Sequence, residues 1–208
     1  HLPDSSWRPL ISKFGYSAGF LIVILGRQQL FTENTLTVIL PLLLRKDKET
    51  FTGVLRLWSI VFAANIIGAL TFSWVISNTV IFRPEILQTF TNIGIEAMEG
   101  DPGTIFLRAV FAGWLIALMV WLLPAAESAR VWIIIIMTYL VALGGFAHII
   151  AGSVEVSFAV FSGAATWSEF FIGWMIPTLL GNIAGGVSLV AVLAHAQVVN
   201  QEKDQQDK

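Results

Sequence analysis

Apolar segments long enough to cross a lipid bilayer restrict the fold of this chain more than any other feature. Residues 52–77 and 104–123 each contain a single charged side chain, Arg56 and Arg108 respectively. The hydrocarbon core of a bilayer is spanned by about 20 apolar residues in a helix. Charged residues make up only 12% of the chain, well below the share of about 25% that is usual in soluble domains. We therefore predict an all-α polytopic membrane protein.

A single transmembrane domain, residues 1–208, is expected. Its membrane segments are predicted at about 13–44, 52–77, 104–123, 131–161 and 168–196. The first and fourth of these are too long and too interrupted for one straight span, so we expect both to be broken. The remaining parts are polar: an interfacial loop at 1–12, an acidic loop at 78–103 and a charged tail at 200–208.

The first interruption lies within residues 26–35, where seven of ten side chains are charged or carry amide or hydroxyl groups. A continuous helix facing lipid would not place these groups at mid-membrane. We predict a half-helix at about 13–29, an irregular turn near Thr32 and a second half-helix at about 35–44. Two separate helices joined by a surface loop are the alternative, which is weaker because about ten residues cannot span a bilayer.

The second interruption combines paired glycines, Gly144 and Gly145, with an imidazole at His148. Glycine supports a helix poorly, and an ionisable side chain inside a membrane is costly. We predict a half-helix at 131–146, a break around His148–Ser153 and a short apolar piece at Val156–Phe161. His148 either faces a polar cavity or is buried in a helix–helix contact, and the residues alone leave both readings open.

The chain carries an internal repeat. Asn65 and Gly68 have the same spacing as Asn182 and Gly185, and the two asparagines are 117 positions apart. Such pairs let membrane helices approach closely. The two breaks recur at nearly the same distance, since Thr32 and His148 are 116 positions apart. Three spans in each unit would invert the halves in the membrane, and we expect a further membrane helix before His1. Inverted repeats with broken helices place the transport site at the midplane, between the breaks.

Half-helix ends suit a small anion, because their free N–H groups and positive dipole point toward the break. Thr32 can donate or accept a hydrogen bond beside one break, and His148 can carry a proton near neutral pH beside the other. The apolar residues nearest the breaks are candidates for a constriction, although ordinary packing explains any one of them equally well. These candidates are Leu30, Phe31, Phe146 and Ile149.

Basic residues predict the orientation. If the spans alternate, seven fall on one side and four on the other, which places the 45–51 loop and the C-terminus in the cytoplasm. The seven are Arg45, Lys46, Lys48, Arg56, Arg130, Lys203 and Lys208, and the four are Arg8, Lys13, Arg83 and Arg108.

A net charge of −2 gives no indication of a nucleic-acid partner, and there is no cysteine. The sequence has no metal-ligand cluster, nucleotide loop or catalytic triad, so we expect no metal, no cofactor and no enzyme.

Four stretches resemble the formate/nitrite transporter family, and one of them, Phe106-Leu107-Arg108 through Trp114-Leu115, is similar to its fourth helix. Leu30-Phe31-Thr32 is similar to its first break, and Gly145-Phe146-Ala147-His148 to its second. Ile176-Pro177-Thr178 through Gly185-Gly186 resembles the pattern of its last helix. The resemblance covers nearly the whole chain. It implies an aquaporin-like six-helix protomer, a homopentamer with one pore in each protomer, and passage of small monovalent anions across a bacterial inner membrane.

The sequence departs from the family pattern at four polar positions. A glutamate before the histidine, two asparagines and an acidic residue are replaced by Ala147, Gly113, Gly152 and Gln29 respectively. A histidine without its carboxylate loses a preference for the charged form. The first hypothesis is a channel or proton-coupled carrier for small weak-acid anions, with His148 and Thr32 at the site. The alternatives are an aquaporin-like pore for a neutral solute, although neither break contains Asn-Pro, and a membrane scaffold that does not transport.

Overall fold

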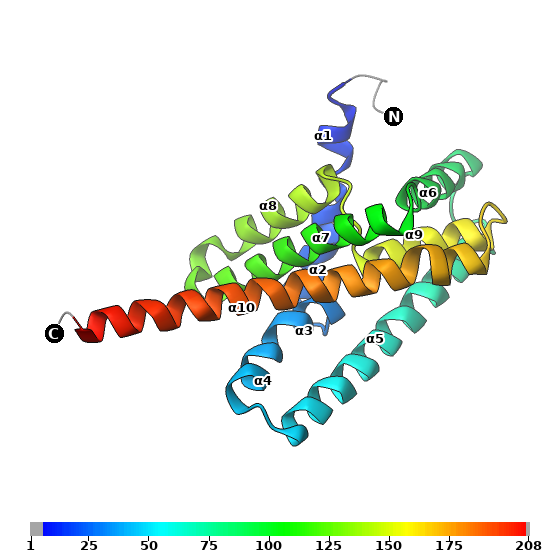
Figure 1. Cartoon of the computed structure of the whole chain (residues 1–208). Helices are drawn as coiled ribbons and strands as arrows, with labels where there is room; N and C mark the ends of the chain where they lie inside the picture. The colour runs from blue at the N-terminus through cyan, green and yellow to red at the C-terminus, as the bar shows by residue number, and fades with distance from the viewer. Residues whose placement is uncertain (1–5, 207–208) are drawn as a thin grey trace.

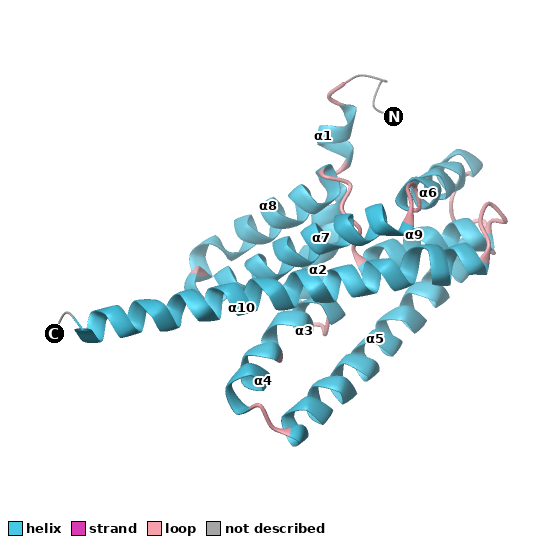
Figure 2. Cartoon of the chain, in the orientation of Figure 1, coloured by secondary structure: helices cyan, strands magenta, loops and turns pink. Residues whose placement is uncertain are grey.

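The computed structural model describes residues 6–206 and is a bundle of helices with no strand among those residues (Figures 1 and 2). The α-helices are α1 (Arg8–Ser12), α2 (Gly15–Leu25), α3 (Phe31–Thr37), α4 (Ile39–Arg45), α5 (Lys48–Ser77), α6 (Pro84–Ala97), α7 (Pro102–Leu122), α8 (Arg130–Leu143), α9 (Ile149–Phe161) and α10 (Ile176–Gln206). Short 3₁₀ turns at Leu123–Ala125 and Glu127–Ala129 lead from α7 to α8, and a π-helical segment, Glu169–Met175, runs into α10.

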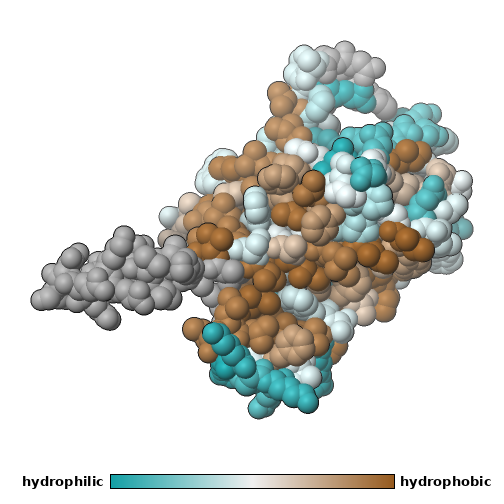
Figure 3. All heavy atoms as spheres, viewed as in Figure 1, coloured by the Kyte–Doolittle hydropathy of each residue, from teal (hydrophilic) through white to brown (hydrophobic). Residues whose placement is uncertain are grey.

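Four helical stretches within the described residues have the length and apolar composition to cross a membrane: Arg8–Leu25, Lys48–Ser77, Pro102–Ala125 and Glu169–Leu189. On the face shown in Figure 3, apolar side chains cover much of the surface, and hydrophilic surface gathers near the turn between α4 and α5 and around α6. Large apolar side chains of α5, such as Ile60 and Ile67, are more than half exposed. The all-α membrane fold predicted from the sequence is therefore confirmed.

Two of these spanning helices, α5 and α7, are capped by the aspartate that precedes their first residue. The Asp47 carboxylate accepts a hydrogen bond from the Thr50 N–H at 2.7 Å, and Asp101 accepts from Gly103 at 2.8 Å and Thr104 at 3.2 Å. A carboxylate at this position satisfies free amides and interacts favourably with the helix dipole. The Thr104 hydroxyl, and after it the Thr104 backbone N–H, donates a hydrogen bond to the Asp101 carboxylate. These bonds hold the pKa of Asp101 below its ordinary value of 3.8.

The first broken segment is irregular from Gly26 to Leu30, and α3 begins at Phe31. The turn predicted near Thr32 is therefore placed too late, because Thr32 lies in the first turn of α3. The half-helix after the break is itself interrupted at Val38, between α3 and α4. Pro41 explains this second interruption, since proline has no N–H to bond the carbonyl one turn earlier.

The second broken segment is irregular from Gly144 to His148, and α9 begins at Ile149. The break predicted around His148–Ser153 is therefore also placed too late along the chain. Of these residues only His148 lies outside α9. Ser153 is tolerated inside α9 because its hydroxyl donates to the carbonyl oxygen of Ile149 at 2.6 Å.

The two breaks share one backbone conformation, offset by 118 positions. Gly26 has φ −73° and ψ 0°, and Gly144 has φ −75° and ψ −4°. The next residues, Arg27 and Gly145, both have positive φ, at 53° and 60°. The residues before the second half-helices also match: Leu30 has φ −107° and ψ 129°, and His148 has φ −109° and ψ 122°. His148 is therefore the structural equivalent of Leu30 in the repeat. The prediction that His148 is equivalent to Thr32 is wrong by two residues.

Helices also occur where loops were predicted. The acidic loop expected at 78–103 contains α6, whose first residue is Pro84. Within the interfacial loop expected at 1–12, residues 8–12 form α1, and residues 1–5 lie outside the described part of the chain. The last helix continues to Gln206, through most of the tail expected at 200–208, of which residues 207–208 are also outside the described part.

Among the described residues, the most extensive contact between two helices is that of α7 with α10. A Cβ added to Gly185 would lie 2.2 Å from the carbonyl oxygen of Val110, and one added to Gly113 would lie 2.5 Å from that of Asn182. Gly185 thus makes the close contact expected from the sequence. Its repeat counterpart Gly68 does not, because no atom of another helix lies within 4 Å of an added Cβ there. Elsewhere, α3 packs on α10 and α9 packs on α5, so each second half-helix lies against the last helix of the other repeat.

Candidate functional site

A hydrogen bond joins the two breaks. The hydroxyl oxygen of Thr32, in the first turn of α3, lies 2.8 Å from Nε2 of His148, the residue before α9. Both side chains are almost completely buried, with 1% and 2% of their surface exposed. These two residues are 116 positions apart in the chain, and they meet at the point where the two second half-helices begin.

The other ring nitrogen of His148 determines the direction of this bond. Nδ1 accepts the N–H of Ala151 at 3.2 Å. A nitrogen that accepts a hydrogen bond carries no proton, so this geometry assigns the ring proton to Nε2. Nε2–H then donates to the Thr32 hydroxyl oxygen, and the proton of that hydroxyl remains available for another acceptor. The pair therefore presents a hydrogen-bond donor at the meeting point of the half-helices.

Two asparagines fix the backbone around the breaks. Asn182 Oδ1 accepts the N–H of Ile149 at 2.8 Å, while its Nδ2 donates to the carbonyl oxygens of Ala147 at 2.9 Å and Ala109 at 2.8 Å. The side chain thus spans His148 and ties α9 to α7 and α10. These contacts go beyond the helix packing that the sequence predicted for this residue.

Asn65 has the equivalent position in the other repeat. Its Oδ1 accepts the N–H of Phe31 at 3.0 Å, and its Nδ2 donates to the carbonyl oxygen of Gln29 at 3.1 Å. It therefore spans Leu30 in the same way that Asn182 spans His148. The recurrence of the asparagine is thus explained by one function of its amide in both halves.

Four of the six candidate pathway residues are apolar, and the structure places them differently. Leu30, Phe31 and Ile149 are buried, with 6%, 2% and 0% of their surface exposed. Phe31 packs its ring against those of Trp58 and Phe62, and it belongs to the same apolar cluster as Ile149.

Phe146 lies apart from Phe31 and Ile149. It is half-buried and stacks on Phe111 of α7, with 5.3 Å between ring centroids and an angle of 20° between ring planes. It packs at the edge of a second apolar cluster, which contains Phe20 and Leu30. The candidate constriction residues are therefore divided between two clusters.

Phe20 is a site residue that the sequence reasoning missed. Its ring meets the imidazole of His148 edge to face, with centroids 5.1 Å apart. Phe20 is buried in α2, in the same cluster as Leu30, Ile116 and Val141. No local motif marks it, because its contact with His148 depends on how α2 packs beside the second break.

The structure shows what surrounds three of the positions that depart from the family pattern, namely Gly152, Gly113 and the position before His148. At Gly152, an added Cβ would lie 2.4 Å from the indole ring of Trp174, so that ring occupies the space where a larger side chain would begin. Gly113 is held in the close contact of α7 with α10 described above. Among residues 6–206, no carboxylate is hydrogen-bonded to His148, whose partners are Thr32 and the Ala151 N–H. The imidazole is therefore placed by a hydroxyl and a backbone amide.

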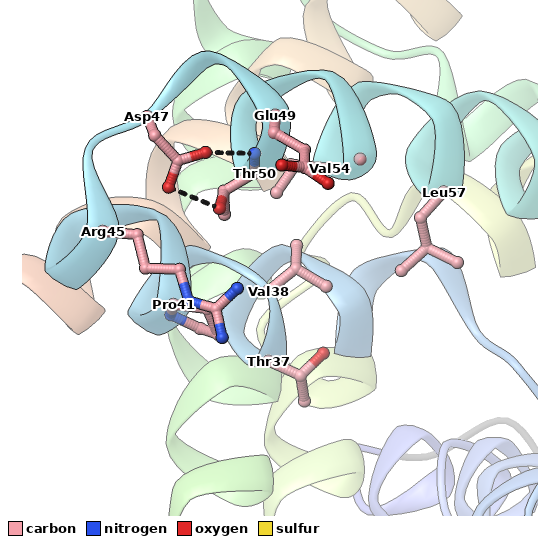
Figure 4. Close-up of a pocket in the computed structure, with 10 residues that line it drawn as sticks. Thr37, Val38, Pro41, Arg45, Asp47, Glu49, Thr50, Val54 and Leu57 are labelled. Carbon is pink, nitrogen blue, oxygen red and sulfur yellow. Dashed lines mark hydrogen bonds between the residues drawn. The ribbon is translucent and has the colours of Figure 1, made fainter.

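A groove of about 410 Å³ lies elsewhere, between α4 and the start of α5 (Figure 4). Arg45, Thr37 and Leu57 are among the side chains around it, and Asp47 at its rim is already bonded to Thr50. Neither Thr32 nor His148 lines this groove. Across the described residues, no group of three or more His, Cys, Asp or Glu side chains could hold a metal ion.

Comparison with known proteins identifies the family. The sequence profile described as "Formate/nitrite transporter" matches residues 1–196. The chain belongs to the formate/nitrite transporter family. This is a family of transporters and channels rather than of enzymes.

Two relatives illustrate the range of formate/nitrite transporter sequences. The chain is 44% identical to the inner membrane protein YfdC of Escherichia coli over 191 residues, which cover 92% of this chain and 62% of that protein. It is 27% identical to a probable formate transporter of Methanothermobacter thermautotrophicus over 196 residues, covering 86% of this chain and 71% of the relative. The chain thus spans less than two thirds of the length of YfdC.

Two solved structures of the formate/nitrite transporter type have the same fold. One, described as a pentameric formate channel with formate bound, matches with a TM-score of 0.79 and 22% identity over 92% of this chain and 83% of that one. Another, described as an FNT family ion channel, matches with a TM-score of 0.76 and 19% identity over 94% of this chain and 80% of that one. The fold is therefore the aquaporin-like one that the resemblance implied.

Proposed function

We propose that this protein conducts small monovalent anions of weak acids, such as formate and nitrite, across a membrane. The proposed route passes between the two breaks, beside Thr32 and His148. The observation that carries the proposal is the 2.8 Å hydrogen bond between these buried side chains, one from each repeat. The names of the relatives, which include a probable formate transporter, support the choice of solute class.

In this proposal the site selects anions by its dipoles and donors. The N-terminal end of α9 points its positive dipole at the break. The Thr32 hydroxyl, which accepts from His148, uses its own proton to bond an oxygen of the anion. Phe20, Leu30 and Phe31 surround the pair with apolar surface, which excludes hydrated metal cations because it offers them no ligand.

His148 acts here as a hydrogen-bond donor that orients Thr32. Coupling to protons would require Nδ1 to take up a proton, and that proton would face the N–H of Ala151. The ring would then have to release this amide before it could carry charge. We therefore propose that any proton coupling proceeds through rotation or displacement of the ring.

The same proposal covers assembly and location. We propose a homopentamer in the bacterial inner membrane, with the C-terminus in the cytoplasm and lipid around the assembly. The description of one structural neighbour as pentameric and the name of the YfdC relative support the first two points. The excess of basic residues on one side of the spans supports the orientation.

A pore for a neutral small solute is the second candidate. It is favoured by one observation, namely that the partners of His148 within the described chain are a hydroxyl and an amide rather than a carboxylate. Such partners suit an uncharged imidazole. A scaffold that does not transport is the third candidate.

Uptake by liposomes tests the proposal. The full-length protein is reconstituted, and formate and nitrite uptake is followed at acidic and neutral pH, with His148→Ala in parallel. The proposal predicts uptake above that of empty liposomes, which the substitution abolishes or makes independent of pH. Folded, oligomeric protein that gives no formate or nitrite uptake would refute it, and glycerol or urea uptake would then favour a neutral-solute pore.

A further inference from the structure

Two buried polar side chains beside the second break have no hydrogen-bond partner among residues 6–206. They are the indole N–H of Trp174 and the hydroxyl of Thr178. Trp174 is 1% exposed and Thr178 is 0% exposed. Buried donors and acceptors are almost always paired in native proteins, so an unpaired group needs a specific explanation.

These two groups lie one helical turn apart and continue a line of polar side chains. Trp174, Thr178 and Asn182 are spaced by four residues, which places them on the same face of the helix. Asn182 of this line bonds the first N–H of α9 at 2.8 Å. The face therefore points toward the start of the half-helix that carries His148.

Contacts of the Trp174 ring show how near it lies to the candidate pathway. The ring fills the space beside Gly152, the fourth residue of α9, and stacks on Phe170 with 6.1 Å between centroids. It belongs to the same apolar cluster as Phe31 and Ile149. Trp174 thus brings an N–H donor into the apolar surface beside the breaks.

Local helix geometry also marks this segment. Trp174 lies in the π-helical stretch Glu169–Met175, which precedes α10. π-Helical turns are rare and frequently occur at functional sites, because the extra residue redirects the side chains that follow. Here the stretch ends just before the turn that carries Thr178.

We propose that Trp174 Nε1–H and the Thr178 hydroxyl form a second binding position for the permeating anion, next to the Thr32–His148 pair. Both groups donate to an oxygen of a small carboxylate or of nitrite, so the anion passes from one pair of donors to the other. The inference rests on the function proposed above and assigns it two further residues. The position offers hydrogen bonds without a fixed positive charge, which suits transit rather than tight binding.

Formate uptake by liposomes containing the full-length protein tests this position. Trp174→Phe keeps an aromatic ring and removes the N–H, and Thr178→Val removes the hydroxyl at nearly constant shape. Each should raise the formate concentration for half-maximal uptake by about tenfold, the effect of losing a hydrogen bond to a charged group. Thr178→Ser should restore the wild-type value. Trp167→Phe and Thr71→Val, at exposed positions, are the matched controls.

The outcomes separate this inference from the function on which it rests. Wild-type protein that takes up neither formate nor nitrite overturns both. If the wild type conducts, and both substitutions leave its half-saturating concentration unchanged, the second position alone is refuted and the two groups serve a resident water. A rise in maximal uptake at constant half-saturation also refutes it, because that result indicates a wider passage rather than a lost donor.

Discussion

The hydroxyl oxygen of Thr32 and Nε2 of His148 are 2.8 Å apart, and each side chain stands at the start of a different second half-helix. Two identically shaped breaks and two asparagines hold this relationship. Because Nδ1 of His148 accepts a backbone amide, the bond runs from the imidazole to the hydroxyl. Thr32 is then the residue that offers a donor to a passing solute.

Asn182 should contribute more to stability than its counterpart Asn65. Asn182→Ala leaves three backbone groups without their partner in a fully buried place, whereas Asn65→Ala leaves two in a partly exposed one. Each buried group left unpaired costs about 1–3 kcal/mol. Thermal unfolding in detergent should show a clearly larger loss for Asn182→Ala, and equal losses in the two variants would contradict the assignment.

Gly185 and Gly68 should respond in opposite ways to alanine. A Cβ at Gly185 would meet the Val110 carbonyl oxygen at 2.2 Å, whereas one at Gly68 meets nothing within 4 Å. We expect Gly185→Ala to cost about 1–3 kcal/mol through overpacking. Gly68→Ala should be neutral or slightly stabilising, because alanine favours a helix more than glycine does. Thermal stability of the two variants measures this difference, and a stable Gly185→Ala protein would show that α7 and α10 pack less closely.

Acid should weaken the start of α7. Hydrogen bonds from the Thr104 hydroxyl, and to a lesser extent from the Thr104 backbone N–H, lower the pKa of Asp101 in the folded state. A lowered folded-state pKa gives stability that is complete above the ordinary value of 3.8 and is lost as the pH falls through the folded-state value. Asp101→Asn has no such charge to lose. As the pH falls below 3.8 the wild type should therefore lose more thermal stability than Asp101→Asn, and parallel pH profiles would count against a stabilising carboxylate.

The sequence predicted the existence of both breaks because polar groups and paired glycines interrupt apolar runs. It did not predict where they end. Ser153 and Gly152 looked like part of a break, yet a hydroxyl bond to Ile149 and the Trp174 ring accommodate both inside α9. Such compensation comes from neighbouring turns and helices, so it cannot be inferred from local composition.

Part of the candidate site was also hidden from the sequence. His148 and Thr32 stood out as polar groups beside breaks, but Phe20 and Trp174 are ordinary apolar residues until the helices pack.

Helix α6 was missed because the acidic residues of 78–103 suggested a loop. Pro84 at its first position was an available signal, since proline is favoured at the first turn of a helix.

Formate uptake by liposomes carrying Thr32→Val tests the central claim most directly. Valine keeps the shape of threonine and removes the donor, Thr32→Ser retains the hydroxyl, and Thr71→Val, on the exposed surface of α5, is the control. The Thr32–His148 account predicts that Thr32→Val lowers uptake by about tenfold or more, as expected for a lost hydrogen bond to a charged group, while Thr32→Ser and Thr71→Val conduct like the wild type. Folded Thr32→Val protein that takes up formate at the wild-type rate would contradict it.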